Sequence, residues 1–197
     1  FRKKQILFRE NTFSKGIYII RKGKVKIYHT NSDGKESIIH IYKKGDYFGY
    51  IPLLANTPHP VSASALDNSI VTFIPASVFN EILNGSLHLA QKLLINLSQE
   101  FSVWINKASV SSQYPLKERV ALSLLILSKV FDNNHATKNK HITISLNRDD
   151  FAAFVGTAKE TLVRMFRVFK DEKIITAKGT KITILKPKAL EALIEHI

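Results

Sequence analysis

The sequence predicts an α+β fold in which an N-terminal double-stranded β-helix (jelly roll) is followed by a long helix and a C-terminal helix-turn-helix domain. Three observations support this prediction. Short β-rich runs separated by turns occupy residues 1–85, and apolar residues in steps of three and four run through residues 86–114. Two short amphipathic helices separated by a glycine turn, followed by a hairpin, fall within residues 115–197.

Five β-rich runs predict the strands of the first part. Turn signals follow the first run at Lys22-Gly23 and the second at Asp33-Gly34. Many short strands at this spacing are typical of a small antiparallel barrel or jelly roll. The runs cover residues 16–20, 24–28, 37–42, 61–65 and 69–75.

The long helix carries a heptad-like seam that ends before Pro115. Its apolar members include Leu87, Leu94, Leu97, Phe101 and Trp104. A seam of this length favours a helix that pairs with a second copy of the chain, and the alternative is a helix buried within its own chain. Four apolar residues lie off the seam and are expected to pack on the β-roll: Leu93, Ile95, Val103 and Ile105.

The C-terminal part begins with a helix over residues 116–130, followed by a polar loop over 132–141 and a short strand over 142–146. Asn147 is expected to cap a short helix that ends at Gly156, a residue that tolerates a left-handed turn. Thr157 is expected to cap a second helix, whose apolar arc comprises Leu162, Met165, Phe166 and Phe169. Residues 173–185 then predict a hairpin.

The opposite arc of that second helix carries charged side chains that suit base edges. Lys159 lies at its edge, and Glu160, Arg164 and Arg167 lie within it. Lysine or arginine donates to guanine O6 and N7, and glutamate accepts from cytosine N4. The alternative is a solvated charged face. The preceding turn, the basic hairpin with Lys178 and Lys181, and the free amides at a helix start beside Thr157 favour DNA binding.

Composition agrees with an anionic partner. The 197 residues contain 29 Lys and Arg against 16 Asp and Glu, a net charge of +13. Such an excess favours nucleic acid over a membrane surface. Both halves are basic, so charge alone does not locate the contact surface.

No run approaches the length of a membrane span and no signal peptide opens the chain, so we expect a cytoplasmic protein without membrane contact. The 197 residues contain no cysteine. Disulfides, zinc–cysteine sites and cysteine-held iron–sulfur clusters are therefore excluded for these residues, and we expect no cofactor. Because the chain opens at Phe1 and not at methionine, we expect the natural N-terminus to lie further upstream.

Two segments resemble the Crp/Fnr family of transcriptional regulators. "GKVKIYHTNSDGKESIIHIYKKGDYFG" is similar to the β-roll core of that family, and "LNRDDFAAFVGTAKETLVRMFRVFKDEKII" to its DNA-binding segment. The resemblance implies an effector-type β-roll domain at 1–85, a dimerisation helix and linker at 86–114, and a winged helix-turn-helix at 115–197. It also implies a homodimer on a palindromic operator, with RNA polymerase as a protein partner.

The resemblance places Lys159, Glu160 and Arg164 where the family carries an Arg-Glu pair and a second Arg that read a TGTGA-like half-site. Lys159 departs from the pattern, because an ammonium lacks the planar fork of a guanidinium. We therefore expect DNA binding, and Lys159 leaves the sequence of the half-site open.

The candidate effector pocket departs further from members that bind cyclic AMP. Gly49 is retained, but Tyr50 stands where those members have a glutamate, and His59-Pro60 where they have Arg-Ser. Trp104 and Ile105 replace a hydroxyl pair that contacts adenine. We expect that cyclic AMP is not bound in the usual manner, that Tyr50 and Trp104 partly fill the pocket, and that the effector is a different one or absent.

Two other classes of protein remain as alternatives. One is a ligand-binding regulatory module that acts on a protein partner and not on DNA. A weaker one is a metal enzyme on a cupin-type roll. His29, His40 and His59 occur singly, without the paired spacing of a metal site, and none of the hydrolase, P-loop or zinc-protease motifs occurs. We therefore expect neither a metal nor catalysis.

Overall fold

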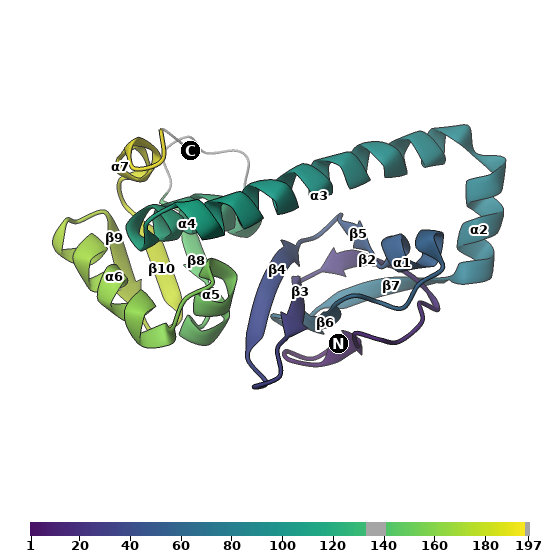
Figure 1. The fold of residues 1–197 in the computed structure, drawn as a ribbon, viewed down its shortest axis with the longest axis horizontal. Helices are drawn as coiled ribbons and strands as arrows, with labels where there is room; N and C mark the ends of the chain where they lie inside the picture. The colour runs from purple at the N-terminus through teal and green to yellow at the C-terminus, as the bar shows by residue number, and fades with distance from the viewer. Residues whose placement is uncertain (133–140, 196–197) are drawn as a thin grey trace. The chain divides into compact units, whose positions relative to one another are not determined.

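The computed structural model describes residues 1–132 and 141–195. The chain divides into two compact units, Phe1–Asn106 and Lys107–Ile197 (Figure 1). The boundary lies inside the long helix, whereas the sequence led us to treat that helix as a separate part. The predicted polar loop falls, from 133 to 140, outside the described residues.

The first unit is a roll of two antiparallel sheets, which confirms the predicted jelly-roll class (Figure 1). One sheet has the strand order β1-β6-β3-β4 and the other the order β5-β2-β7. The first sheet comprises β1 (Ile6–Phe8), β6 (Ser62–Ala65), β3 (Val25–Thr30) and β4 (Glu36–Tyr42). The second comprises β5 (Tyr47–Phe48), β2 (Gly16–Lys22) and β7 (Ile70–Pro75).

The predicted turn between β2 and β3 is confirmed and depends on a glycine. Gly23 has φ +88°, and a Cβ there would lie 2.3 Å from Ser69 Oγ. A side chain is therefore excluded both by the left-handed backbone and by the neighbouring chain. The turn returns β3 beside β6, where Val25 pairs with Ala65 in the antiparallel ladder and both side chains are buried.

Two helices and most of a third complete the first unit: α1 (Tyr50–Ala55), α2 (Ala76–Gly85) and, as far as Asn106, α3 (Leu87–Gln113). α2 packs against β2 and β7. The side chain of Leu93 is buried in a core cluster with Ile17, Tyr50 and Phe79, and Leu97 packs against that cluster. The expectation that all four off-seam residues pack on the β-roll is therefore corrected. Leu93 is buried, whereas Ile95, Val103 and Ile105 are exposed.

The second unit builds a three-stranded antiparallel sheet and four helices from the described residues. The sheet has the order β8-β10-β9. The elements are α4 (Leu116–Phe131), β8 (Thr143–Ser145), α5 (Arg148–Val155), α6 (Lys159–Asp171), β9 (Ile175–Lys178), β10 (Lys181–Ile184) and α7 (Pro187–Ala192). The predicted helices and hairpin are confirmed, and α7 was not predicted. Among the described residues, no helix is both long and apolar enough to cross a membrane.

Candidate nucleic-acid interface and apolar cavity

The turn between α5 and α6 is fixed by local hydrogen bonds. Asn147 caps α5 as predicted, because its side-chain oxygen accepts from the amide of Asp150 at 2.8 Å. Gly156 ends α5 in the left-handed conformation, φ 76° and ψ 49°. The expectation that Thr157 caps α6 is wrong. The amide of Thr157 still donates to the carbonyl of Ala152, so Thr157 belongs to the end of the preceding turn. Ala158 occupies the cap position of α6, and no side chain caps the helix there.

The side chain of Arg119 on α4 stabilises this turn by hydrogen bonds. Its Nη2 donates to the carbonyl oxygen of Val155 at 3.0 Å and of Gly156 at 2.6 Å. These are carbonyls at the C-terminal end of α5, which have no partner within their own helix. A charged donor on them also complements the helix dipole. Arg119 therefore holds the geometry of the turn on which the direction of α6 depends.

α6 divides into a buried and an exposed face, as the sequence predicts. The side chains of Leu162, Phe166 and Phe169 are buried, and the ring of Phe166 meets that of Phe151 on α5 edge to face at 5.0 Å. The opposite face is open to solvent and carries Lys159, Glu160, Arg164 and Arg167. This anchoring presents the charged side chains on a rigid element.

Lys159 is paired within the chain. Its Nζ lies 2.9 Å from Oδ1 of Asp149, in the first turn of α5. Both side chains are substantially exposed, so the pair itself contributes little stability. The carboxylate nevertheless places a negative charge beside a lysine expected to meet DNA. This pairing is a feature that the sequence reasoning did not anticipate.

A second unanticipated residue is Val163. It lies beside Glu160 at the edge of the open side of α6 and is 40% exposed, although it is apolar. The sequence places it near this face at 100° per residue, but a single apolar residue among charged ones gives no signal of DNA binding. An exposed methyl-bearing side chain in this position suits the C5 methyl group of thymine.

The tip of the hairpin brings two lysines together. Lys178 and Lys181 are cross-strand partners beside the turn at Gly179, and both side chains are exposed. Like charges directly opposite each other destabilise a hairpin. An anion such as a DNA phosphate would relieve that repulsion, so the pair is well suited to a phosphate contact.

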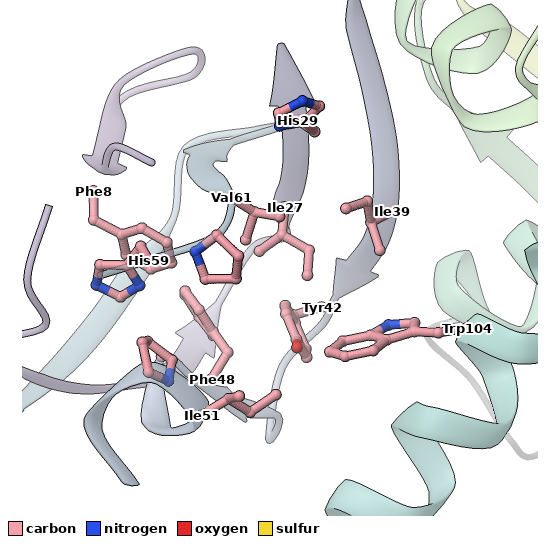
Figure 2. Close-up of a pocket in the computed structure, with 13 residues that line it drawn as sticks. Phe8, Ile27, His29, Ile39, Tyr42, Phe48, Ile51, His59, Val61 and Trp104 are labelled. Atoms are coloured by element: carbon pink, nitrogen blue, oxygen red, sulfur yellow. The ribbon is translucent and has the colours of Figure 1, made fainter. Parts of the chain in front are cut away.

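The β-roll contains a partly open cavity of about 440 Å³ (Figure 2). Its lining includes three of the predicted pocket residues: Gly49, His59 and Trp104. Most of the remaining wall is formed by apolar and aromatic side chains from the strands, from α1 and from the segment before β6, and His29 of β3 also lines it. Among the described residues that line it, none is a lysine, arginine, aspartate or glutamate.

Tyr50 does not line this cavity, which corrects the expectation that it fills the pocket. Gly49 adopts φ 86° and starts α1, and the fully buried side chain of Tyr50 then packs in the cluster below α3. Its hydroxyl donates to Oε2 of Glu100 at 3.4 Å and accepts from Nδ2 of Asn96 at 2.9 Å. Burial raises the pKa of Tyr50, so its hydroxyl stays protonated as a donor.

His59 forms part of the cavity wall as a neutral ring. It is 3% exposed and stacks on Phe8, with ring centroids 3.8 Å apart (Figure 2). Burial lowers the pKa of His59 below its ordinary value, which disfavours the imidazolium. No cluster of three His, Cys, Asp or Glu side chains suited to a metal ion occurs in the part of the chain that the structure describes.

α3 separates its apolar residues into two sets. Leu97 and Trp104 are partly buried against the β-roll, whereas Leu87, Leu94 and Phe101 are exposed, Leu94 by 63% and Phe101 by 58%. Of the five residues predicted for a dimer interface, three are therefore open in the single chain and two are partly covered by it.

The two units and their sites define a class of protein, a regulator with a ligand-type β-roll and a DNA-reading helix-turn-helix. Family models match both parts: a cyclic nucleotide-binding domain over residues 1–86 and a Crp-like helix-turn-helix domain over residues 118–193. The chain belongs to the Crp/Fnr family, whose members are transcriptional regulators and not enzymes.

Relatives and solved structures agree with this assignment. The chain is 28% identical to the fumarate and nitrate reduction regulatory protein of Yersinia pestis, across 97% of this chain and 76% of that protein. It is 28% identical to the transcriptional activator protein Anr of Pseudomonas protegens, across 98% and 78%. Its fold is similar to that of FixK2 from Bradyrhizobium japonicum, with a TM-score of 0.84, 22% identity and coverage of 98% and 94%.

Proposed function

We propose that the protein is a homodimeric, sequence-specific DNA-binding regulator that acts on a palindromic operator. The observation that carries the proposal is the exposed face of α6, where Glu160, Arg164 and Arg167 project from a helix anchored by three buried side chains. The N-terminal part of such a helix enters the major groove. Glu160 accepts from cytosine and Arg164 donates to guanine, while Thr157 and Lys159 lie near the helix start, within reach of the backbone.

Dimerisation follows from the open apolar side chains of α3. Leu94 and Phe101 are one heptad apart and exposed, together with Leu87 at the start of the helix. Exposed apolar residues at this spacing suit a parallel partner helix of the same sequence. A two-fold dimer would present two copies of α6 to two half-sites, which is the physical basis for a palindromic operator.

The proposed regulator does not use cyclic AMP in the usual family manner. A phosphate in the cavity would meet no lysine or arginine among the described lining residues, and Pro60 has no amide hydrogen. Burial lowers the pKa of His59, and His29 is already paired with Glu10. Titration of cyclic AMP into the protein at pH 7 in a calorimeter is expected to give no binding heat and no gain in DNA affinity. Micromolar binding would contradict this part of the proposal.

The partners proposed besides DNA are a second copy of the chain and RNA polymerase. RNA polymerase follows as a partner from membership of a family of transcriptional regulators. Action on transcription implies a location in the cytoplasm, where bacterial transcription occurs. Co-purification with RNA polymerase on an operator fragment, compared with the operator fragment alone, tests it. A polymerase that binds equally in the absence of the protein would contradict it.

The test of the function is selection of bound sequences from random DNA, followed by mobility shift on the selected site across a salt series. We expect an inverted repeat whose half-sites are about one helical turn apart. The selected site should bind roughly a thousandfold or more tightly than scrambled DNA. Equal affinity for both, with a salt dependence alone, would indicate nonspecific charge attraction. Lys188→Ala, an exposed lysine on α7, is the control that should leave the selected sequence unchanged.

A further inference from the structure

The cavity in the β-roll is a large, partly open space for a small domain. Its volume of about 440 Å³ lies within the range of small-molecule sites, roughly 300–1,000 Å³. Water finds few hydrogen-bond partners on apolar walls. An apolar cavity of this size therefore suits an apolar ligand better than water.

The wall has flat aromatic surfaces on two sides. Phe8 and His59 form one stacked pair, with an interplanar angle of 11°. Tyr42 and Phe48 form another, with ring centroids 4.9 Å apart and an angle of 14°. Figure 2 shows these rings around the cavity, with Trp104 approaching from α3. Flat walls of this kind favour a planar ring system.

The chemistry of the wall disfavours a buried anion. No lysine or arginine side chain lines the cavity among the described residues, and burial lowers the pKa of His59. His29 also lines the cavity, but its ring already contacts the carboxylate of Glu10 at 2.9 Å. Burying a phosphate or carboxylate without a cation or sufficient donors carries a large desolvation cost. A neutral molecule incurs no such cost.

Trp104, a residue of the cavity wall, has a polar group that lacks a hydrogen-bond partner. Nε1 of Trp104 is buried and has no hydrogen-bond partner in the part of the chain that the structure describes. Buried N–H groups almost always have an acceptor. A ligand with a carbonyl or ether oxygen at this end of the cavity would supply one.

We propose that the cavity binds a neutral, planar and largely apolar small molecule that carries one hydrogen-bond acceptor for Nε1 of Trp104. Trp104 belongs to α3, the helix that carries the exposed Leu94 and Phe101. The ligand therefore contacts the helix proposed for dimerisation and is placed to bias DNA binding. This effector role rests on the proposed function, but ligand binding itself does not.

Three matched probes test the ligand class on the 197-residue chain: 9-fluorenone, fluorene, which lacks the carbonyl, and 9-fluorenone-4-carboxylate, which adds an anion. Trp104 is the only tryptophan of the chain, so quenching of its fluorescence reports on the cavity directly. Fluorenone is expected to bind about three- to tenfold more tightly than fluorene, the value of one hydrogen bond. The carboxylate and cyclic AMP are expected to bind at least roughly a hundredfold more weakly than fluorenone.

Two variants locate the site. Trp104→Phe, followed by calorimetry, should remove the preference for fluorenone over fluorene and retain binding of both. Val61→Phe should fill the cavity and weaken both probes, and Val61→Met gives a graded loss if the larger residue prevents folding. Binding unchanged in the Val61 variants would overturn the assignment of the site, and a preference retained in Trp104→Phe would overturn the role of Nε1.

The remaining outcomes separate this inference from the proposed function. Absence of binding by both neutral probes, or equal binding of the carboxylate, overturns the ligand class even if the protein binds its operator. Tight fluorenone binding by a protein that reads no DNA sequence supports the site and removes its effector role. A change of operator affinity with fluorenone, absent in Val61→Phe, supports both.

Discussion

Tyr42 donates a hydrogen bond to Oε1 of Glu100 over 3.2 Å, and so connects the last residue of β4 to the middle of α3. Glu100 is 7% exposed and also accepts from Asn96 at 3.1 Å and from Tyr50 at 3.4 Å. Tyr42 additionally lines the apolar cavity. One tyrosine thus touches both the proposed ligand site and the buried carboxylate of the proposed dimer helix.

The first prediction concerns pH. Burial raises the pKa of Glu100, and the nearby Asp46 raises it further against the opposing hydrogen bonds. The folded state therefore holds the proton more tightly than the unfolded state. The stability that Glu100 contributes is fully present below its unfolded-state pKa of about 4.3. It is lost as the pH rises through the higher pKa that Glu100 has in the folded state. We expect wild type to lose stability relative to Glu100→Gln across that interval.

Denaturant unfolding followed by Trp104 fluorescence between pH 4 and pH 8 measures this difference. Comparison with the Gln variant cancels the contribution of His59, which has the opposite sign because its pKa is lowered. Tyr42→Phe keeps the ring stacked on Phe48 and should cost about 1–3 kcal/mol at neutral pH, since it removes a donor from a buried carboxylate. A difference between wild type and Glu100→Gln that stayed constant with pH would show that the carboxylate is not perturbed.

The second prediction concerns base reading. Arg164→Ala is expected to cost about 1–3 kcal/mol at the preferred operator and to relax discrimination at one base position. Lys178→Ala and Lys181→Ala are expected to weaken binding to all sequences about equally and to lower the salt slope. Mobility shift on the operator and on single-base variants, at several salt concentrations, distinguishes the two behaviours. An unchanged preference in Arg164→Ala would mean that the register of α6 on DNA is wrong.

The sequence predicts the longer strands of the β-roll better than its short strands and the position of Tyr50. Strands β2, β3, β4, β6 and β7 were predictable because β-branched runs are bounded by turns. The two- and three-residue strands β5 and β1 carry too few residues for a pattern. The sequence pattern put Tyr50 in the pocket, but the backbone decides where its side chain points. The chain turns at Gly49 into α1, and the side chain of Tyr50 then points toward Glu100 and away from the cavity.

The long helix shows a second limit. Periodicity identifies apolar residues on α3 but does not say which of them the same chain covers. Leu93 is buried and Leu97 is partly buried against the β-roll, whereas Leu94, immediately beside Leu93, is open. Only the tertiary packing separates these two stripes. The charged face of α6 was predictable because its buried face has a clear helical spacing.

The third prediction concerns the dimer. Leu94→Glu with Phe101→Glu places charges on the open apolar side of α3 and is expected to give monomers. Loss of the link between half-sites should weaken operator binding by roughly a hundredfold or more. Light scattering gives the mass, and mobility shift gives the affinity. Ile82→Glu, at an apolar position on α2 that is 50% exposed, is the control that should remain dimeric. A double variant that keeps the mass of a dimer would contradict the proposed interface.

The fourth prediction concerns the pair between Lys159 and Asp149. Asp149→Asn removes a negative charge 2.9 Å from the lysine and releases its ammonium for DNA. We expect operator affinity to rise about two- to fivefold at low salt and the gain to shrink at high salt. Asp171→Asn makes the same charge change at the far end of α6 and should have a smaller effect. Equal gains in the two variants would point to net charge alone.

The fifth prediction tests Val163 as a reader of thymine. Val163 and Val168 are both 40% exposed, but Val163 lies in the N-terminal half of α6, which enters the groove, and Val168 lies near its C-terminal end. Replacing single thymines of the operator by deoxyuridine removes only the C5 methyl group. At one position of each half-site this should cost wild type about 0.8 kcal/mol, or roughly fourfold in affinity. Val163→Ala should abolish that cost at the same position, because the two changes remove one contact. Val168→Ala should leave the cost intact. If every deoxyuridine position behaved alike in wild type and Val163→Ala, Val163 would have no part in base reading.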